Sequence, residues 1–182
     1  MKGKKLAVYC GSRDGNLSCY VQETAALGSL MAQRGVTLVY GGARLGLMGA
    51  LADAVLAGGG DVIGVIPKSM MTPDIAHPSL ERLEVVASMH ERKARMMSLA
   101  DGLIALPGGY GTLEELFEAL AWSQLCLHTK PVGLLNLNLY FDGLLSFLDR
   151  SVEEGFVSIQ NRRLLLEAQT PVELLTRLSQ SL

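Results

Sequence analysis

This sequence contains few cysteines and few histidines, and it has no excess of positive charge. Its three cysteines form no CxxC pair, and its three histidines show no metal-ligand spacing, so neither a disulfide framework nor a metal site is indicated. Lys and Arg total 16 against 18 Asp and Glu, a formal net charge of -2. Such a chain has no basic excess to neutralise a nucleic acid backbone. We therefore expect no metal and no nucleic acid partner.

Long hydrophobic runs are also missing. A membrane-spanning helix needs about 20 apolar residues, and the apolar stretch at 131–148 is broken by Asn136, Asn138 and Asp142. The basic N-terminus leads into an apolar stretch, 6–10, that is too short for a signal peptide. We expect a cytoplasmic protein without membrane contact. With 182 residues, 49% of them hydrophobic, the sequence fits one domain over 1–182.

The hydrophobic pattern is that of an α/β protein. Short runs rich in apolar and β-branched residues alternate with stretches of helical period, as in a parallel sheet covered by helices. We predict a single-domain, Rossmann-like, doubly wound parallel sheet with helices on both faces. The expected strands are 6–10, 36–40, 62–66, 83–87, 103–106, 132–135 and 164–167, and the expected helices are 18–33, 47–57, 89–100, 113–127, 141–153 and 171–178. An irregular stretch with three prolines, 67–78, could form a flap over a site.

Three glycine-containing turns follow predicted strands, where ligands bind in doubly wound sheets. The first turn places Ser12 beside Gly11, and the second contains the Gly41-Gly42 pair. Each offers small backbone groups near a helix start, which suits an anion. The second turn is equally well explained by tight packing of a strand against a helix. Ser12 and Gly42 are therefore candidate substrate-binding residues.

The third turn carries the strongest pattern. It runs from the strand 103–106 through Pro107 into a helix, and its glycines free the backbone to curl round a phosphate at a helix N-terminus. Neither a G-x-G-x-x-G dinucleotide motif nor a G-x-x-x-x-G-K-[ST] P-loop is present in the chain. This disfavours NAD binding and nucleoside triphosphate hydrolysis. The candidate phosphate-binding residues are Gly108, Gly109, Tyr110, Gly111 and Thr112.

Two charged residues could act beside this turn. Glu115 follows Thr112 by three residues, so it is either a helix-capping partner of Thr112 or a carboxylate near the ligand's sugar. Arg92 shares a helical stripe with Met89 and Lys93 on an otherwise apolar face, and a buried guanidinium needs a carboxylate or a phosphate. We expect Arg92 to meet Glu115, as a structural ion pair or as a catalytic one, with Lys93 supplying charge near the phosphate. Met89, Arg92 and Lys93 are therefore further candidate substrate-binding residues.

At these residues the chain closely resembles the Lonely Guy family of cytokinin riboside 5'-monophosphate phosphoribohydrolases, often labelled lysine decarboxylases. The resemblance rests on the segments 107–112 with Glu115 and 89–93, supported by 10–12 and 46–49. It implies a Rossmann-like fold and an assembly that is at least a homodimer, and the reaction described below is expected to need no cofactor. It also implies that Arg92 and Glu115 are the catalytic pair and that residues 108–112 bind the phosphate.

The implied reaction is hydrolysis of the N-glycosidic bond of a nucleoside 5'-monophosphate, AMP or a cytokinin riboside monophosphate, to free base and ribose 5-phosphate. Positive charge develops on the ribose in such a reaction, so a carboxylate stabilises the transition state and can activate water. Beside Arg92 and a helix N-terminus, Glu115 is expected to stay ionised at neutral pH.

Two other functions remain open. A lysine decarboxylase would bind pyridoxal phosphate on a lysine, and only Lys68 and Lys93 lie near the expected site. A carrier could bind a nucleotide-like ligand through the same turns without converting it.

A homodimer is also expected from the helix 113–127, because its apolar residues cover more than one face. They are Leu116, Phe117, Leu120, Trp122, Leu125 and Leu127.

Overall fold

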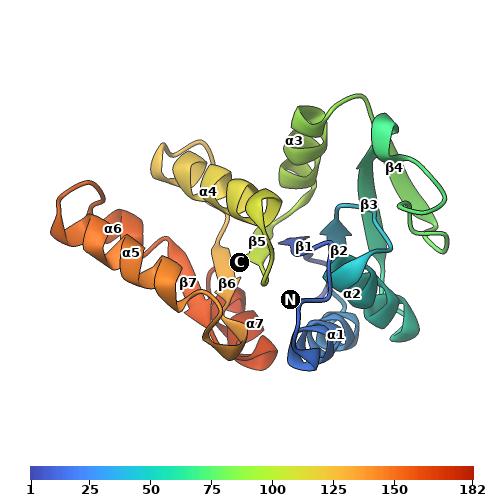
Figure 1. The fold of residues 1–182 in the computed structure, drawn as a ribbon, viewed down its shortest axis with the longest axis horizontal. Coiled ribbons are helices and arrows are strands. Elements are labelled where there is room, and N and C mark those ends of the chain that lie inside the picture. Colours follow the sequence, from blue (N-terminus) through green and yellow to red (C-terminus); the bar gives the residue numbers. More distant parts are fainter.

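Strands and helices alternate along the chain, and the computed structural model describes all residues 1–182 (Figure 1). The strands are β1 (Lys5–Tyr9), β2 (Thr37–Tyr40), β3 (Val62–Pro67), β4 (Arg82–Val86), β5 (Gly102–Ala105), β6 (Val132–Leu135) and β7 (Leu165–Ala168). The helices are α1 (Ser18–Gln33), α2 (Gly46–Ala57), α3 (Met89–Leu99), α4 (Tyr110–Gln124), α5 (Asp142–Glu153), α6 (Ile159–Arg162) and α7 (Pro171–Ser179), with 3-10 turns η1 (Lys68–Met70) and η2 (Leu137–Leu139).

All seven strands form one parallel sheet in the order β4-β3-β2-β1-β5-β6-β7. The chain builds outward from β1 to β4 on one side and then returns to place β5 on the other side of β1. In a doubly wound sheet, the crevice at this reversal of strand order is the usual ligand site. The predicted fold class is confirmed, and the crevice lies between the ends of β1 and β5.

Helices cover both faces of the sheet, because successive side chains of a strand point to opposite faces. In β1, Leu6 and Val8 pack with residues of α1, α2 and α7, whereas Ala7 and Tyr9 pack with residues of α3 and α4. Both sets are nearly inaccessible to solvent. The two helical layers lie on opposite sides of the sheet (Figure 1). None of the helices combines the length and apolar character needed to cross a bilayer.

The predicted helix 113–127 is wrong at both ends, since α4 spans Tyr110–Gln124. Its residue before the first turn is Gly109, and no side chain caps it, so the glycine turn feeds directly into the helix. Thr112 is therefore the third helical residue rather than a cap. The short helix α6 and the turn η2 were not predicted, because single-turn elements are too short for a periodic pattern.

The proline-containing stretch Pro67–Pro78 lies against the second glycine turn. Ala76 forms an antiparallel bridge with Ala43, and the His77 amide donates to the carbonyl oxygen of Gly42 at 2.9 Å. This stretch therefore adjoins the carboxyl end of β2, next to the predicted site.

Candidate active site

The third glycine turn needs glycine at one position and leaves open space at two others. A Cβ at Gly108 would lie 2.1 Å from the Thr112 Oγ1 and 2.9 Å from the Gly11 nitrogen, whereas a Cβ at Gly109 or Gly111 would meet nothing within 4 Å. Gly108 thus closes the turn onto α4, and the other two expose backbone. The first amides of a helix have no acceptor within it, and the Gly109 amide has no backbone acceptor either. An anion can therefore approach these donors.

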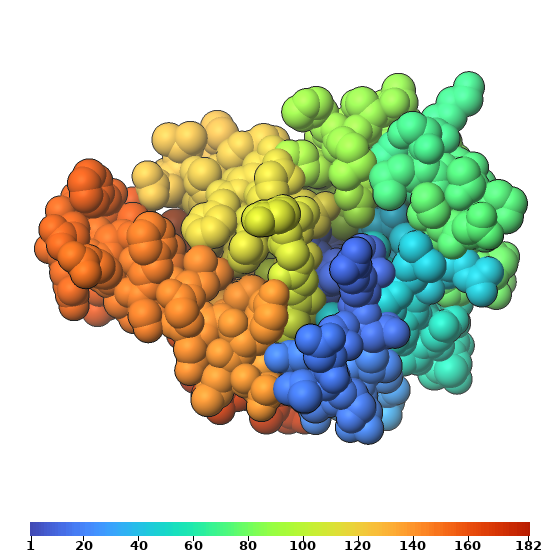
Figure 2. Space-filling view, viewed as in Figure 1, coloured from blue at the N-terminus to red at the C-terminus, as the bar shows by residue number.

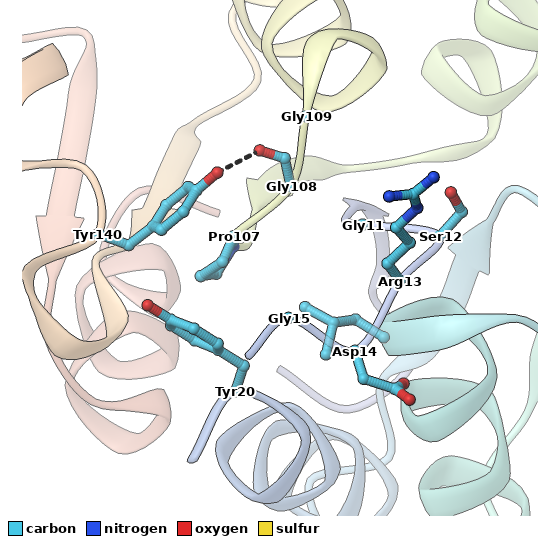
Figure 3. Close-up of a pocket in the computed structure, with 11 residues that line it drawn as sticks. Gly11, Ser12, Arg13, Asp14, Gly15, Tyr20, Pro107, Gly108, Gly109 and Tyr140 are labelled. Carbon is cyan, nitrogen blue, oxygen red and sulfur yellow. Dashed lines mark hydrogen bonds between the residues drawn. The ribbon is translucent and has the colours of Figure 1, made fainter. Parts of the chain in front are cut away.

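A pocket of about 370 Å³ opens at the crevice between β1 and β5, and Figure 3 shows its walls. One wall is the loop after β1 and the opposite wall carries two tyrosines. In the space-filling view, the segments that follow β1, β5 and β6 meet on one face of the molecule (Figure 2). The lining residues are Gly11, Ser12, Arg13, Asp14, Gly15, Tyr20, Leu47, Pro107, Gly108, Gly109 and Tyr140.

The second glycine turn supports this pocket through packing. Gly46 has a φ of +56°, and a Cβ there would lie 2.3 Å from the Arg13 nitrogen, so the turn presses against the loop after β1. Gly42 has a φ of +74°, and a Cβ there would lie 3.0 Å from the Leu83 Cδ1. Both positions are in the left-handed region that favours glycine. Gly42, predicted to bind substrate, does not line the pocket.

Arg92 and Glu115 come together from α3 and α4, as the helical stripe predicted. The Arg92 Nη1 donates to the Glu115 Oε1 at 3.1 Å, and the side chains are 12% and 9% exposed. The Arg92 Nε donates to the carbonyl oxygen of Val65 at 3.2 Å, which anchors the guanidinium at the carboxyl end of β3. The Glu115 Oε2 accepts no hydrogen bond from the chain. One carboxylate oxygen is therefore held while the other stays free.

Gly41 makes room for this guanidinium, a role that the sequence did not reveal. A Cβ at Gly41 would lie only 2.1 Å from the Arg92 Nη2. Any side chain here would push the guanidinium away from its present position. The adjacent glycines after β2 were visible in the sequence, but only the packing of Arg92 from α3 shows which of them faces the charged pair.

Burial raises the pKa of Glu115 to about 7, and Arg92 offsets only part of that effect. Glu114 also raises this pKa, Lys93 lowers it, and Glu118 raises it. The expectation of a fully ionised carboxylate at neutral pH is therefore wrong. Desolvation disfavours the charged form by more than one cation restores, so Glu115 titrates near neutrality.

Tyr9 and Cys10 lie at the end of β1, beneath this pair. Burial, followed by the charge of Glu115, raises the pKa of both groups far above their ordinary values. Both groups therefore stay neutral at physiological pH. A thiol must lose its proton to act as a nucleophile, so the structure disfavours Cys10 as a catalytic nucleophile.

Lys93 is engaged by carboxylates rather than free. Its Nζ forms ion pairs with Glu114 and, at 3.2 Å, with Glu118. Burial alone would lower the pKa of Lys93, but the hydrogen bonds to these two glutamates raise it. The expectation that Lys93 supplies free charge near a phosphate needs correction, because two acidic residues of α4 already neutralise it.

The remaining predicted residues divide between the pocket and its surroundings. Ser12, Gly108 and Gly109 line the pocket. Thr112 is buried against Gly108, and Glu115 lies about one helical turn farther along α4. The other predicted binding residues do not line it: Met89, Tyr110 and Gly111 are exposed, with Tyr110 94% accessible.

Sequence reasoning missed Arg13, Tyr20 and Tyr140, which complete the pocket walls. Arg13 follows the predicted Ser12 directly and is the one cationic side chain that lines the pocket. The position of Arg13 after a strand could have suggested it. Tyr20 lies in the first turn of α1 and Tyr140 follows η2, and only the tertiary fold brings these two segments together.

A family model described as "Possible lysine decarboxylase" matches residues 48–178. Decarboxylation with pyridoxal phosphate would need a lysine amine that forms a Schiff base with the cofactor. No lysine lines the pocket, Lys93 is held by two carboxylates, and Lys68 lies exposed on η1. The residues present therefore do not fit this cofactor.

Solved structures of other proteins share the fold. A molybdenum cofactor binding protein from Rippkaea orientalis superposes with a TM-score of 0.74 at 24% identity, covering 100% of this chain and 98% of that chain. A Moco carrier protein from Chlamydomonas reinhardtii gives a TM-score of 0.72 at 22% identity, covering 100% and 98%. These likenesses establish the fold alone.

Curated relatives are much more similar in sequence. The probable cytokinin riboside 5'-monophosphate phosphoribohydrolase LOGL3 of Oryza sativa subsp. japonica is 49% identical over 97% of this chain and 84% of its own length. The cytokinin riboside 5'-monophosphate phosphoribohydrolase LOG1 of Arabidopsis thaliana is 48% identical over 97% of this chain and 83% of its own length. With this similarity over nearly the whole chain, and with an arginine–glutamate pair beside a glycine turn, the chain belongs to the Lonely Guy family of cytokinin riboside 5'-monophosphate phosphoribohydrolases.

Proposed function

We propose that this protein hydrolyses the N-glycosidic bond of nucleoside 5'-monophosphates, AMP or a cytokinin riboside monophosphate, to free base and ribose 5-phosphate. The observation that carries the proposal is the buried Arg92–Glu115 pair, one helical turn from a glycine turn with free amides. The turn suits the 5'-phosphate, and the carboxylate suits the sugar next to it. The relatives named for this reaction cover the chain almost completely.

Glu115 would act at the anomeric carbon. As the bond to the base breaks, the ribose gains positive charge, which a nearby carboxylate stabilises. The free Glu115 Oε2 can take a proton from the attacking water while Arg92 holds the Oε1 in place. A pKa of about 7 for Glu115 suits a general base, because proton transfer is most effective when the pKa lies near the working pH.

The phosphate would be held by backbone amides and by one cation. The amides at the start of α4 and the helix dipole favour a negative charge there. Ser12 adds a hydroxyl, and Arg13, which forms no ion pair with this chain, adds charge. Arg13 therefore replaces Lys93 as the cation that we assign to the phosphate.

Incubation of the pure protein with AMP or a cytokinin riboside monophosphate, without added metal, tests the proposal by chromatography of the products. We expect free base and ribose 5-phosphate, with the corresponding nucleoside a poor substrate because it lacks the group that the turn binds. A carrier that binds a nucleotide-like ligand is the alternative. It needs no Arg92–Glu115 pair, and binding without release of base would support it.

We further propose that one domain of residues 1–182 assembles as a cytoplasmic homodimer. Helix α4 buries Leu116 against the sheet yet exposes Phe117. Leu125 and Leu127, which follow α4, and Phe147 of α5 are exposed as well. Apolar side chains on an outer face are typical of a subunit interface. Three free cysteines suit a reducing compartment. Sedimentation at micromolar concentration should show twice the 19.5 kDa chain mass, and a monomer alone would contradict the assembly.

A further inference from the structure

Tyr140 connects the segment after β6 to the glycine turn after β5. Its hydroxyl donates a hydrogen bond to the carbonyl oxygen of Gly108 at 2.7 Å (Figure 3). The Tyr140 ring meets Tyr20 edge to face, with centroids 5.9 Å apart, and meets Phe141 at 4.8 Å. The ring is thus fixed on the pocket wall by two aromatic neighbours, and its hydroxyl reaches the turn.

The turn that carries Tyr140 is built with local strain. Asn138 and Leu139 have φ values of 49° and 59°, although neither is glycine. Asparagine adopts this left-handed region fairly readily, but leucine does not, so the Leu139 conformation persists only where the surroundings enforce it, and such residues gather at functional sites. A strained turn of this kind needs contacts that hold it in its conformation.

Asn136 supplies these contacts through two hydrogen bonds. Its side chain is buried, its Oδ1 accepts from the Phe141 amide at 2.7 Å, and its Nδ2 donates to the Asp142 Oδ1 at 2.7 Å. Both bonds join the start of the turn to its end. The position of Tyr140 between them is therefore determined by the turn and not by a flexible loop.

The hydrogen bond to Gly108 has a consequence for the next amide. In a trans peptide unit the C=O and the following N–H point in opposite directions. Holding the Gly108 carbonyl on Tyr140 therefore turns the Gly109 N–H away from Tyr140, and that N–H has no backbone acceptor of its own. A preorganised donor binds an anion better than one that must first be oriented.

We propose that Tyr140 is a positioning residue for the phosphate turn: its hydroxyl fixes the Gly108–Gly109 peptide so that the Gly109 amide is ready to bind the phosphate. The inference rests on the proposed function, in which this turn holds the 5'-phosphate. Its effect should appear in the binding of phosphorylated ligands and not in the binding of the sugar or base.

Tyr140→Phe tests this, because it keeps the ring and its aromatic contacts and removes only the hydroxyl. We expect the affinity for ribose 5-phosphate, measured by titration calorimetry, to fall about tenfold, as for loss of one ordered hydrogen bond. The KM for AMP should rise by about the same factor with kcat within about threefold, and kcat/KM for adenosine should stay within about twofold. A merely structural tyrosine would not separate phosphorylated from unphosphorylated ligands.

Tyr40→Phe is the matched control, since the Tyr40 hydroxyl is buried, has no hydrogen-bond partner and lies outside the pocket. It should leave ribose 5-phosphate binding unchanged. Asn136→Ala, which releases the turn without altering the Tyr140 ring, should weaken ribose 5-phosphate in the same direction as Tyr140→Phe. Melting curves establish that each variant is folded.

Unchanged ribose 5-phosphate affinity in folded Tyr140→Phe overturns the inference, whatever Asn136→Ala does, and so does a wild-type protein that does not bind ribose 5-phosphate. The titration needs no turnover. If no monophosphate is hydrolysed but Tyr140→Phe still weakens ribose 5-phosphate, the positioning role stands and the proposed hydrolysis fails.

Discussion

Replacing Glu115 by Gln separates a catalytic carboxylate from a structural one. The amide has nearly the same size, and its oxygen can still accept from the Arg92 Nη1 that now lies 3.1 Å from the Glu115 Oε1. The negative charge and the ability to take a proton are lost. We expect kcat for AMP to fall by about two to four orders of magnitude, the range for loss of a positioned base, with nucleotide affinity much less affected. This corresponds to about 3 to 5 kcal/mol of activation free energy.

The pH profile gives a second reading of the same group. With the pKa of Glu115 at about 7, the wild-type protein should lose activity as the pH falls below that value, by about tenfold per pH unit. The residual activity of Glu115→Gln should be independent of pH over the same range. Release of base, followed by chromatography from pH 5 to pH 9, measures both proteins under the same conditions.

Stability should change with pH in the opposite sense. Because the pKa of Glu115 is raised from 4.5 to about 7 on folding, the folded state holds this proton more tightly than the unfolded state does. Its contribution is fully present below pH 4.5 and is lost as the pH rises through about 7, on the order of 3 kcal/mol in total. Glu115→Gln should therefore match the wild type at pH 4 and melt higher than the wild type at pH 8.

Near-normal turnover in Glu115→Gln would refute the catalytic role and leave Glu115 as the structural partner of Arg92. A stability difference without a turnover difference would support that outcome. A capping role would predict a loss of about 1 kcal/mol and normal turnover, but Gly109, not Thr112, precedes α4 and no side chain caps it.

Gly41→Ala should lower turnover strongly while leaving the protein folded, because the new Cβ would lie 2.1 Å from the present position of the Arg92 Nη2 and would displace the flexible end of that side chain. AMP turnover and a melting curve test this, and normal turnover would contradict it. Gly109→Val should abolish AMP binding in calorimetry without unfolding, since its side chain would fill space that is open in front of the turn, and unchanged affinity would remove the turn from the phosphate site. Arg13→Ala should raise the KM for AMP about tenfold with little change for adenosine, and Arg13→Lys should recover part of the loss; equal effects on both substrates would exclude a phosphate contact.

The sequence alone determined the fold class and most element boundaries. Alternation of apolar strands with amphipathic helices specifies a doubly wound sheet because the central strands must bury both faces, and the helices at Ser18, Met89 and Pro171 begin where they were predicted. The start of α4 was misplaced by three residues, since glycine and tyrosine are weak helix formers and a capping pattern at Thr112 looked more favourable. The stripe on α3 correctly placed Arg92 against a carboxylate.

Only the tertiary structure decided which groups meet across distant segments and in what state of charge. Tyr140 reaches Gly108 because β6 lies beside β5 in the sheet, an adjacency that no local pattern encodes. Lys93 is neutralised by α4, and the pKa of Glu115 moves to about 7, because burial depends on every element packed around a group. A residue's neighbours in sequence determine its secondary structure, whereas its electrostatic environment is set by the residues that folding brings into contact with it.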